Sequence, residues 1–233
     1  MKRFSSVALM LLFAASAFAQ PDFGAMKYGV RGGFGIGSVD TTFDDESMKN
    51  QEGNLTGLQF IVGGFAELPV WKSLNLTAEV NYERTGIKNH IKRVDIQGSG
   101  IAAVHVFTDV TTKFPISYVH IPVLAKYNFL RDALYVEAGP QLGLLVGKVN
   151  TYNKTITTAA GMENTVETTT DDTDHFKKSQ WSIVCGWGFN LWAVSAGIRL
   201  SFGVGDIQAD AYKIDGCNVR HTDAQFVIRY SFK

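Results

Sequence analysis

The chain has 233 residues, and its 22 Lys and Arg are balanced by 22 Asp and Glu, which gives a formal net charge of +0 at pH 7. This balance provides no basic excess for holding a polyanion, so we expect no nucleic-acid partner. The mean hydropathy of +0.01 does not separate a soluble protein from a membrane β-barrel, because barrel strands alternate apolar and polar residues. The phase of that alternation is therefore the informative signal.

Residues 1–19 have the pattern of a secretory signal peptide. Two basic residues precede a short apolar run, and an Ala-Phe-Ala cleavage site follows the run. The run is too short to cross a bilayer as a helix, which takes about twenty apolar residues. We therefore expect an exported chain that is cleaved to start at Gln20, with residues 20–233 forming one barrel domain.

The exported part contains eight stretches in which apolar and polar residues alternate with a period of two, which is the period of a β-strand. In chain order these predicted strands are residues 26–37, 58–68, 74–83, 118–129, 134–147, 180–190, 194–203 and 226–232. In most of them one face is apolar, and the other carries Gly, Asn, Gln or charged side chains. The alternation is cleanest in residues 74–83.

The hairpin predicted over residues 118–147 is the clearest transmembrane unit. Its second arm sets Val136 and Ala138 on one face against Glu137 and Gly139 on the other. A strand with an apolar outer face and a polar inner face is typical of an outer-membrane barrel. A soluble barrel would have the opposite phase.

The connections between the predicted strands alternate in length. Short turns are predicted at residues 69–73, 131–132 and 191–192, and long connections between the first two strands and at residues 86–115, 149–178 and 205–222. Outer-membrane barrels have short periplasmic turns, longer extracellular loops and periplasmic termini. The sequence therefore predicts an all-β fold, an eight-stranded antiparallel up-and-down transmembrane β-barrel in the cell outer membrane.

Aromatic residues gather near both ends of the predicted strands, where the membrane interface would lie. The predicted interfacial residues are Trp71, Tyr82, Tyr127, Trp181, Trp187, Trp192, Tyr230 and Phe232. The alternative is a scatter of core aromatics in a β-sandwich, whose strands also alternate faces.

Charged residues on the predicted inner faces balance in sign. They are Arg31, Glu67, Glu79, Glu83, Lys126, Glu137, Arg199 and Arg229. Because an eight-stranded barrel is just wide enough for its own side chains, we expect these groups to form a paired plug. The alternative is a path for protons or ions, which needs a continuous wet lumen. Counting back from the turn places Lys126 opposite Glu137, and we expect these two residues to form an ion pair.

The sequence predicts no catalytic residue, no cofactor-binding residue and no metal site. His90, His105, His175 and His221 fall in predicted loops, where folding would have to assemble a Ser/His/Asp group for an enzyme to result. Three Asp residues in the loop over residues 149–178 lack the ligand spacing and turn Gly of a calcium loop. We therefore expect a protein that is not an enzyme.

Three segments resemble the small outer-membrane β-barrel proteins of the PorT type, which are abundant in Bacteroidetes-like bacteria. The similarity rests on residues 27–33 (KYGVRGG), 118–127 (YVHIPVLAKY) and 134–140 (LYVEAGP). The last strand also resembles the assembly signal of outer-membrane proteins, with Val227 in place of the usual Gly and with Lys233 after the final aromatic. His120 stands where the family often has an acidic residue. The resemblance implies an outer-membrane barrel without fixing an activity.

The expected function follows from this architecture. We expect a structural or interaction protein that acts through its extracellular loops or through envelope partners. The resemblance alone implies an alternative, an accessory of a protein-secretion system; an outer-membrane enzyme and a narrow pore are further alternatives. The expected partners are outer-membrane lipid, the outer-membrane assembly machinery, and other envelope or secretion proteins.

Overall fold

The computed structural model describes residues 26–43, 53–97, 104–159, 162–209, 211 and 217–232. The predicted signal peptide, residues 1–19, lies outside the described residues. None of the described residues belongs to a helix that is long and apolar enough to cross a membrane.

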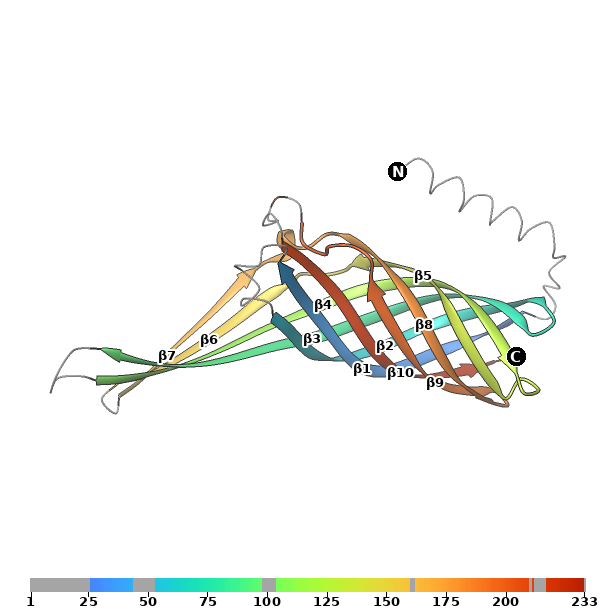
Figure 1. Cartoon of the computed structure of the whole chain (residues 1–233), viewed down its shortest axis with the longest axis horizontal. Helices are drawn as coiled ribbons and strands as arrows, with labels where there is room; N and C mark the ends of the chain where they lie inside the picture. Colours follow the sequence, from blue (N-terminus) through green and yellow to red (C-terminus); the bar gives the residue numbers. More distant parts are fainter. Residues whose placement is uncertain are drawn as a thin grey trace.

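Eight strands form the wall of a barrel. They are β1 (Lys27–Phe43), β2 (Gly53–Trp71), β3 (Leu74–Gln97), β4 (Val104–Phe129), β5 (Leu134–Leu145), β8 (Ser179–Leu191), β9 (Val194–Gly203) and β10 (Cys217–Ser231). Each strand pairs antiparallel with its neighbours, and β1 pairs with both β2 and β10. The pairing of β3 with β4 closes the ring (Figure 1). The predicted eight-stranded antiparallel barrel is thus confirmed.

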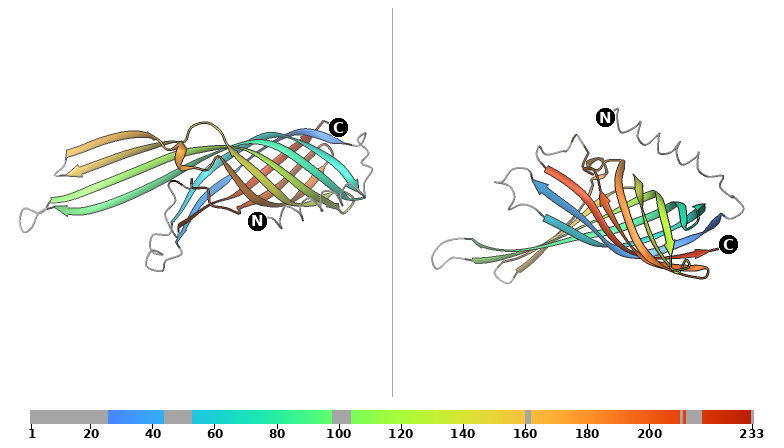
Figure 2. Two further views of the ribbon diagram at one scale, coloured as in Figure 1. Left: turned by 90° about the horizontal axis from the view of Figure 1, so that it is seen from above. Right: turned by 45° about the vertical axis from the view of Figure 1, so that its right-hand side comes forward.

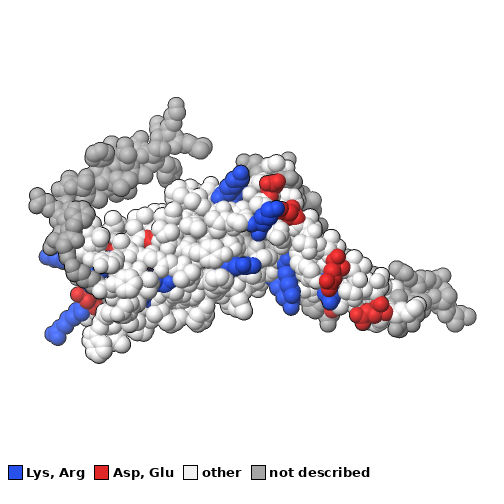
Figure 3. All heavy atoms as spheres, turned by 180° about the vertical axis from the view of Figure 1, so that it is seen from behind, with Lys and Arg blue, Asp and Glu red and all other residues white. Residues whose placement is uncertain are grey.

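The two faces of each strand follow the alternation of the sequence. On β10, Phe226, Ile228 and Tyr230 are exposed, whereas Gln225 and Arg229 are buried. The same phase repeats around the ring, so that a wide band of the outer wall is almost without charged side chains (Figure 3). Such a band is what the hydrocarbon core of a bilayer requires of a protein surface.

The predicted interfacial aromatics lie on the outside of the wall. Seven of the eight are exposed, and Tyr82 is half-buried. Trp192, in the turn between β8 and β9, is 97% exposed. The short turns all lie at one end of the barrel, which is the periplasmic end in barrels of this kind. Phe232 N–H donates to Tyr28 O across 2.9 Å, so the described chain ends meet at that end too.

Two predicted loops are wrong, because much of their length is strand. Residues 86–97 belong to β3 and residues 104–115 to β4, and the two stretches pair with each other as the arms of a long hairpin. Residues 149–178 contain two strands, β6 (Asn150–Ala159) and β7 (Met162–Asp171), followed by a short 3-10 helix, η4 (Thr173–His175). These segments extend into water beyond the lipid, so nothing requires an apolar face, while their many Thr residues still favour extended backbone.

An apolar cluster fills the lumen at the end opposite the short turns. Its buried members, each at most 5% exposed, are Val39, Ile87, Ile116, Tyr118, Val149 and Ile207. Two of them come from connections, Val149 from the start of the β5–β6 excursion and Ile207 from the segment after β9. We call this cluster the apolar cap. It separates the polar interior of the barrel from the extracellular side.

Candidate functional site

The predicted inward charges meet in the middle of the barrel. Glu79 Oε2 accepts hydrogen bonds from Arg31 Nη1 and from Arg199 Nη1, the latter at 2.8 Å. Glu79 Oε1 accepts from Arg199 Nη2 at 3.0 Å and from Arg229 Nη2 at 2.8 Å. All four side chains are at most 2% exposed. One carboxylate from β3 is therefore shared by three guanidinium groups from β1, β9 and β10.

A second carboxylate completes this network. Glu137, on β5, accepts hydrogen bonds from Arg199 Nη2 at 2.6 Å and from Arg229 Nη2 at 2.7 Å. The contacts cross the lumen between strands that are not neighbours in the wall. We call these five residues, Arg31, Glu79, Glu137, Arg199 and Arg229, the arginine network. It occupies the space that a channel would need.

The predicted ion pair between Lys126 and Glu137 is wrong, although the register behind it is right. Lys126 lies directly opposite Glu137 in the β4–β5 ladder. Lys126 Nζ nevertheless donates to Glu67 Oε2 at 2.8 Å, and Asn75 Nδ2 donates to the other oxygen of Glu67 at 2.6 Å. The two guanidinium groups on Glu137 take its oxygens, so Lys126 reaches across to β2 instead.

The ring of Tyr135 lies between this lysine and Arg229, and the ring of Phe65 packs against the same arginine. Lys126 Nζ lies 4.7 Å from the ring centre of Tyr135, and Arg229 stacks over the rings of Tyr135 and Phe65, at 5.8 Å each. Space for the Tyr135 hydroxyl comes from Gly188 and Gly197, since a Cβ at either position would lie 2.6 Å or 2.5 Å from that oxygen. The electron-rich faces of these rings therefore form cation–π interactions with Lys126 and Arg229.

Nearer the apolar cap, Glu83 belongs to a group that the sequence did not reveal. Gln225 Nε2 donates to Asp223 Oδ1 at 2.6 Å and to Glu83 Oε2 at 3.2 Å, and Arg31 Nη2 donates to Gln225 Oε1 at 2.9 Å. His221 lies beside Asp223 on β10. The predicted last strand started too late to include these residues. Arg229 and Gln225 face inward, and inward positions recur every second residue. Extending that alternation toward the N-terminus of the strand would have identified Asp223 and His221 as inward residues.

Three of the four histidines predicted in loops, His90, His105 and His221, lie in strands. His90 is in β3 and His105 is in β4, and only His175, in η4, lies in a connection. His120, on β4, is 2% exposed, and His221 is 5% exposed. The histidines whose side chains reach the lumen are thus closed off from the outside by the apolar cap.

The most prominent feature outside the barrel is a projecting sheet of four strands. Residues 88–97 of β3 pair with β4, residues 106–113 of β4 pair with β6, and β6 pairs with β7. Figures 1 and 2 show the two hairpins side by side, extending far beyond the mouth of the barrel. Ten residues of extended chain span about 33 Å. We call this sheet the extracellular blade.

The outer edge of the extracellular blade is β7. Every residue of β7 is exposed, and β7 is the last strand in the sheet order. Lys154 on β6 and Glu167 on β7 lie directly opposite one another and form an ion pair of 3.2 Å. A hydrogen bond between the side chains of Tyr152 and Glu167 raises the pKa of this tyrosine. The face of the blade is thus polar and solvated, while its edge offers unpaired backbone groups.

The blade is tied to the barrel at its root. Asp171, the last residue of β7, accepts a hydrogen bond from Thr173 Oγ1 at 2.5 Å and from Lys148 Nζ at 3.0 Å. The Thr173 hydroxyl first, and then Lys148, lower the pKa of Asp171 to about 2. In addition, Val149 N–H donates to Thr173 Oγ1 at 2.9 Å. This threonine therefore links β7 to a residue of the apolar cap.

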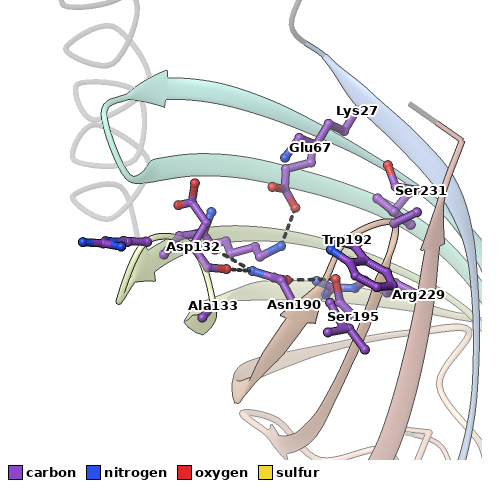
Figure 4. A pocket seen from close by; sticks show the side chains of 15 residues that line it. Lys27, Glu67, Asp132, Ala133, Asn190, Trp192, Ser195, Arg229 and Ser231 are labelled. Carbon is purple, nitrogen blue, oxygen red and sulfur yellow. Dashed lines mark hydrogen bonds and ion pairs between the residues drawn. The ribbon is translucent and has the colours of Figure 1, made fainter.

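The periplasmic end of the barrel contains a cavity of about 350 Å³. Lys27, Glu67 and Trp192 lie around it, contributed by three separate strands or turns (Figure 4). Arg229 and Lys126 also line it. Asn190 Nδ2 donates to Asp132 O at 2.7 Å and ties two of the short turns together at the rim.

Comparison with known families adds one match. Residues 18–209 match a family described as outer membrane protein beta-barrel domain. No curated protein matches the chain.

Several solved structures are similar at low identity. Ail, the attachment invasion locus protein of Yersinia pestis, is 8% identical, with 89% of this chain and 99% of that chain covered and a TM-score of 0.33. The outer membrane protease OmpT from Escherichia coli is 7% identical, with 91% and 98% covered and a TM-score of 0.33. The transport unit of the autotransporter AIDA-I from Escherichia coli is 11% identical, with 98% of each chain covered and a TM-score of 0.29. Likenesses this distant say nothing about activity or partners.

Proposed function

This chain belongs to the outer membrane protein β-barrel domain family, and from that premise we propose that it is an interaction protein whose extracellular blade binds a partner at the cell surface. The barrel anchors the blade in the outer membrane. In this proposal the protein is not an enzyme, and the free edge of β7 is the surface that binds the partner.

The free edge of β7 carries this proposal. An exposed edge strand presents a row of unpaired N–H and C=O groups that can accept an added strand from another protein. β7 is exposed along its whole length, and its apolar side chains Met162 and Val166 are 76% and 53% exposed. Glu163 and Glu167 along the same strand act against edge-to-edge pairing between copies of the chain, because like charges would be brought together.

The contents of the barrel argue against the other functions. A pore needs a continuous wet lumen, whereas the arginine network and the apolar cap fill this one in series. An enzyme acting on macromolecules needs groups that a substrate can reach. His221 and Asp223 are 5% and 2% exposed and lie beneath the cap. The barrel thus supports the role of an anchor better than either role.

The second candidate function is that of an accessory in protein secretion. It rests on the resemblance to PorT-type barrels and is favoured by the periplasmic cavity, whose rim carries the fully exposed Trp192. Large exposed aromatics at a rim are frequent anchors in protein interfaces. A secretion partner would approach from the periplasm and contact this end, whereas a surface partner would contact the blade.

Site-specific photo-crosslinking in intact cells separates the two candidates. A photoreactive residue at Val166 should give a defined adduct with a cell-surface partner, and the same residue at Trp192 should not. Replacing Thr168 by Pro should abolish the Val166 adduct, because proline removes a backbone donor from the edge. The matched control is Thr151→Pro in β6, near the root of the blade, which places a proline in the blade but not on its free edge, so the Val166 adduct should persist.

The outcome at the two positions decides between the candidates. Adducts from Trp192 alone would overturn the proposal in favour of the secretion role. An adduct at Val166 that persists at full yield in the Thr168→Pro variant would show that the partner does not pair with the edge. Outer-membrane fractionation and heat-modifiable gel mobility confirm in each case that the barrel has assembled.

A further inference from the structure

Three side chains beneath the apolar cap form a compact set of metal-ligand types. Glu83 on β3 and His221 and Asp223 on β10 each place one ligand atom within 4.8 Å of the others, and all three side chains are buried. β3 and β10 are not neighbours in the wall, since β2 and β1 lie between them. The three groups therefore converge across the lumen and not along one ladder.

The two carboxylates of this set are each only half satisfied. Gln225 Nε2 binds Glu83 Oε2 and Asp223 Oδ1, while the remaining oxygens, Glu83 Oε1 and Asp223 Oδ2, are buried without a hydrogen-bond partner. Within the described chain, neither carboxylate forms an ion pair with a Lys or Arg. A buried carboxylate oxygen without a donor is costly, by several kcal/mol for an isolated charge.

The neighbouring imidazoles lie close to these oxygens without hydrogen-bonding them. His221 Nδ1 lies 3.9 Å from Asp223 Oδ2, and His120 Nδ1 lies 3.9 Å from Glu83 Oε2. His120 is already engaged by Gln141 Nε2, so His221 is the imidazole left to join the two carboxylates. A gap of this size between nitrogen and oxygen is too long for a hydrogen bond and is of the order that an intervening ion would occupy.

We propose that Glu83, His221 and Asp223 bind one divalent transition-metal ion of the zinc class, which ties β3 to β10 beneath the apolar cap. One imidazole nitrogen with two carboxylate oxygens suits zinc and its first-row neighbours, whereas calcium and magnesium prefer all-oxygen sites. Metal–ligand bonds near 2.1 Å put tetrahedral ligand atoms about 3.4 Å apart, so binding draws the three groups slightly together.

The position of the site gives the ion a structural role. Val39 lies directly opposite His221 and Tyr118 lies directly opposite Glu83, and both belong to the apolar cap. On the other side, Gln225 connects the site to Arg31 of the arginine network. The ion would thus join the two layers that fill the lumen. Because both layers enclose it, it enters while the barrel folds and exchanges slowly afterwards.

The test is to fold the mature chain in detergent with and without Zn²⁺ and to measure bound metal after removal of free ion. The expected result is one zinc ion per folded chain by elemental mass spectrometry. The zinc-bound protein should also lose its folded gel mobility at a higher temperature than the metal-free protein. Glu83→Gln and Asp223→Asn should each weaken zinc binding by more than about 100-fold, since even groups behind the ligands contribute 10- to 100-fold.

A second His–Asp pair in the same chain provides the matched control. His175 Nδ1 lies 3.7 Å from Asp172 Oδ1, but this pair lies outside the barrel, at the two ends of η4, and is partly exposed. The double variant Asp172→Asn, His175→Gln should retain full zinc content. An equal loss of zinc in the control, or full zinc content in both Glu83→Gln and Asp223→Asn, would overturn the site.

The wild-type protein gives a readout that needs no variant to fold. Its Co²⁺ form should show visible bands of a low-coordinate nitrogen and oxygen site, and X-ray absorption should show a shell with one imidazole and no sulfur. A sulfur ligand would have to come from a cysteine, which none of the three proposed ligands is, and would refute the assignment. Folded wild-type protein without stoichiometric metal would refute the site as well. Protonation of Glu83 and Asp223 would then be what neutralises the two carboxylates.

Discussion

Lys126 and Glu137 face each other directly in the β4–β5 ladder, yet Lys126 is hydrogen-bonded at 2.8 Å to Glu67 on β2, on the other side of β3. Cross-strand geometry places the Cβ atoms of two directly opposed residues within about 5.5 Å of each other. The preference for Glu67 follows from competition, because Arg199 and Arg229 occupy Glu137. Two residues that lie opposite each other in the β-ladder are therefore not always the two that form an ion pair inside the barrel.

The first prediction is a test of that partner choice by charge exchange. Lys126→Glu and Glu67→Lys should each lower the free energy of unfolding by about 3–5 kcal/mol, because each leaves buried like charges together. The double variant should recover most of the loss, since the side-chain amide of Asn75 can turn its oxygen toward the new lysine. Urea unfolding in lipid vesicles measures the three values.

The control exchange uses the residue that lies opposite in the ladder. Lys126→Glu combined with Glu137→Lys should recover nothing, because a lysine at position 137 meets two arginines. Recovery in this variant would mean that the ladder partner, and not Glu67, balances Lys126.

The second prediction concerns the shared carboxylate of the arginine network. Glu79→Gln leaves three guanidinium groups around a neutral amide, with Glu137 as their remaining carboxylate. We expect a loss of about 3–5 kcal/mol in the free energy of unfolding. Glu163→Gln, on the exposed face of β7, should change it by less than about 0.5 kcal/mol. Similar small effects of both substitutions would show that the network does not stabilise the barrel.

The third prediction concerns conductance. Purified protein in planar bilayers should show no stable open state, because an ion would have to pass both the arginine network and the apolar cap. Ile207→Asp should loosen the cap and still give no channel, since the network remains. Steady openings of the unaltered protein in single-channel recordings would contradict a filled lumen.

The fourth prediction concerns the pH dependence of the blade root. Thr173 and Lys148 hold the pKa of Asp171 near 2, below its ordinary value of 3.8. A lowered carboxylate pKa means that the contact contributes stability above about pH 4 and loses it as the pH falls toward 2. Carbon-13 titration of the Asp171 carboxyl follows this window directly.

Substitution of the hydroxyl donor provides the matching variant. Thr173→Val should raise the pKa of Asp171 toward 3.8, whereas Thr165→Val, in the middle of β7, should leave the titration unchanged. If the pKa of Asp171 is unchanged in the Thr173→Val variant, the Thr173 hydroxyl is not what lowers it.

Sequence alternation predicts the wall of this barrel well and its contents poorly. Lipid accepts only apolar side chains, so positions such as Phe226 and Ile228 must alternate with inward Gln225 and Arg229, and the strand phase can be read directly. Partner choice inside the barrel has no such periodicity, because Glu79 is reached by arginines from three other strands. The extracellular blade escaped prediction for a related reason: outside the membrane, no lipid imposes an apolar face on β6 or β7.

The arrangement of the arginine network also bears on how the barrel is completed. Arg31 lies on the first strand and Arg229 on the last, and both bind Glu79, which lies on the third. A chain inserted as far as β9 would hold Glu79 and Glu137 with one guanidinium group fewer, in a sheet whose two margins are still open. Arrival of β10 brings Arg229, which binds both Glu79 and Glu137, in the same step that removes the open margins. Completion of the ring and completion of the arginine network are thus a single event, and a β10 paired out of register would leave Arg229 away from both carboxylates.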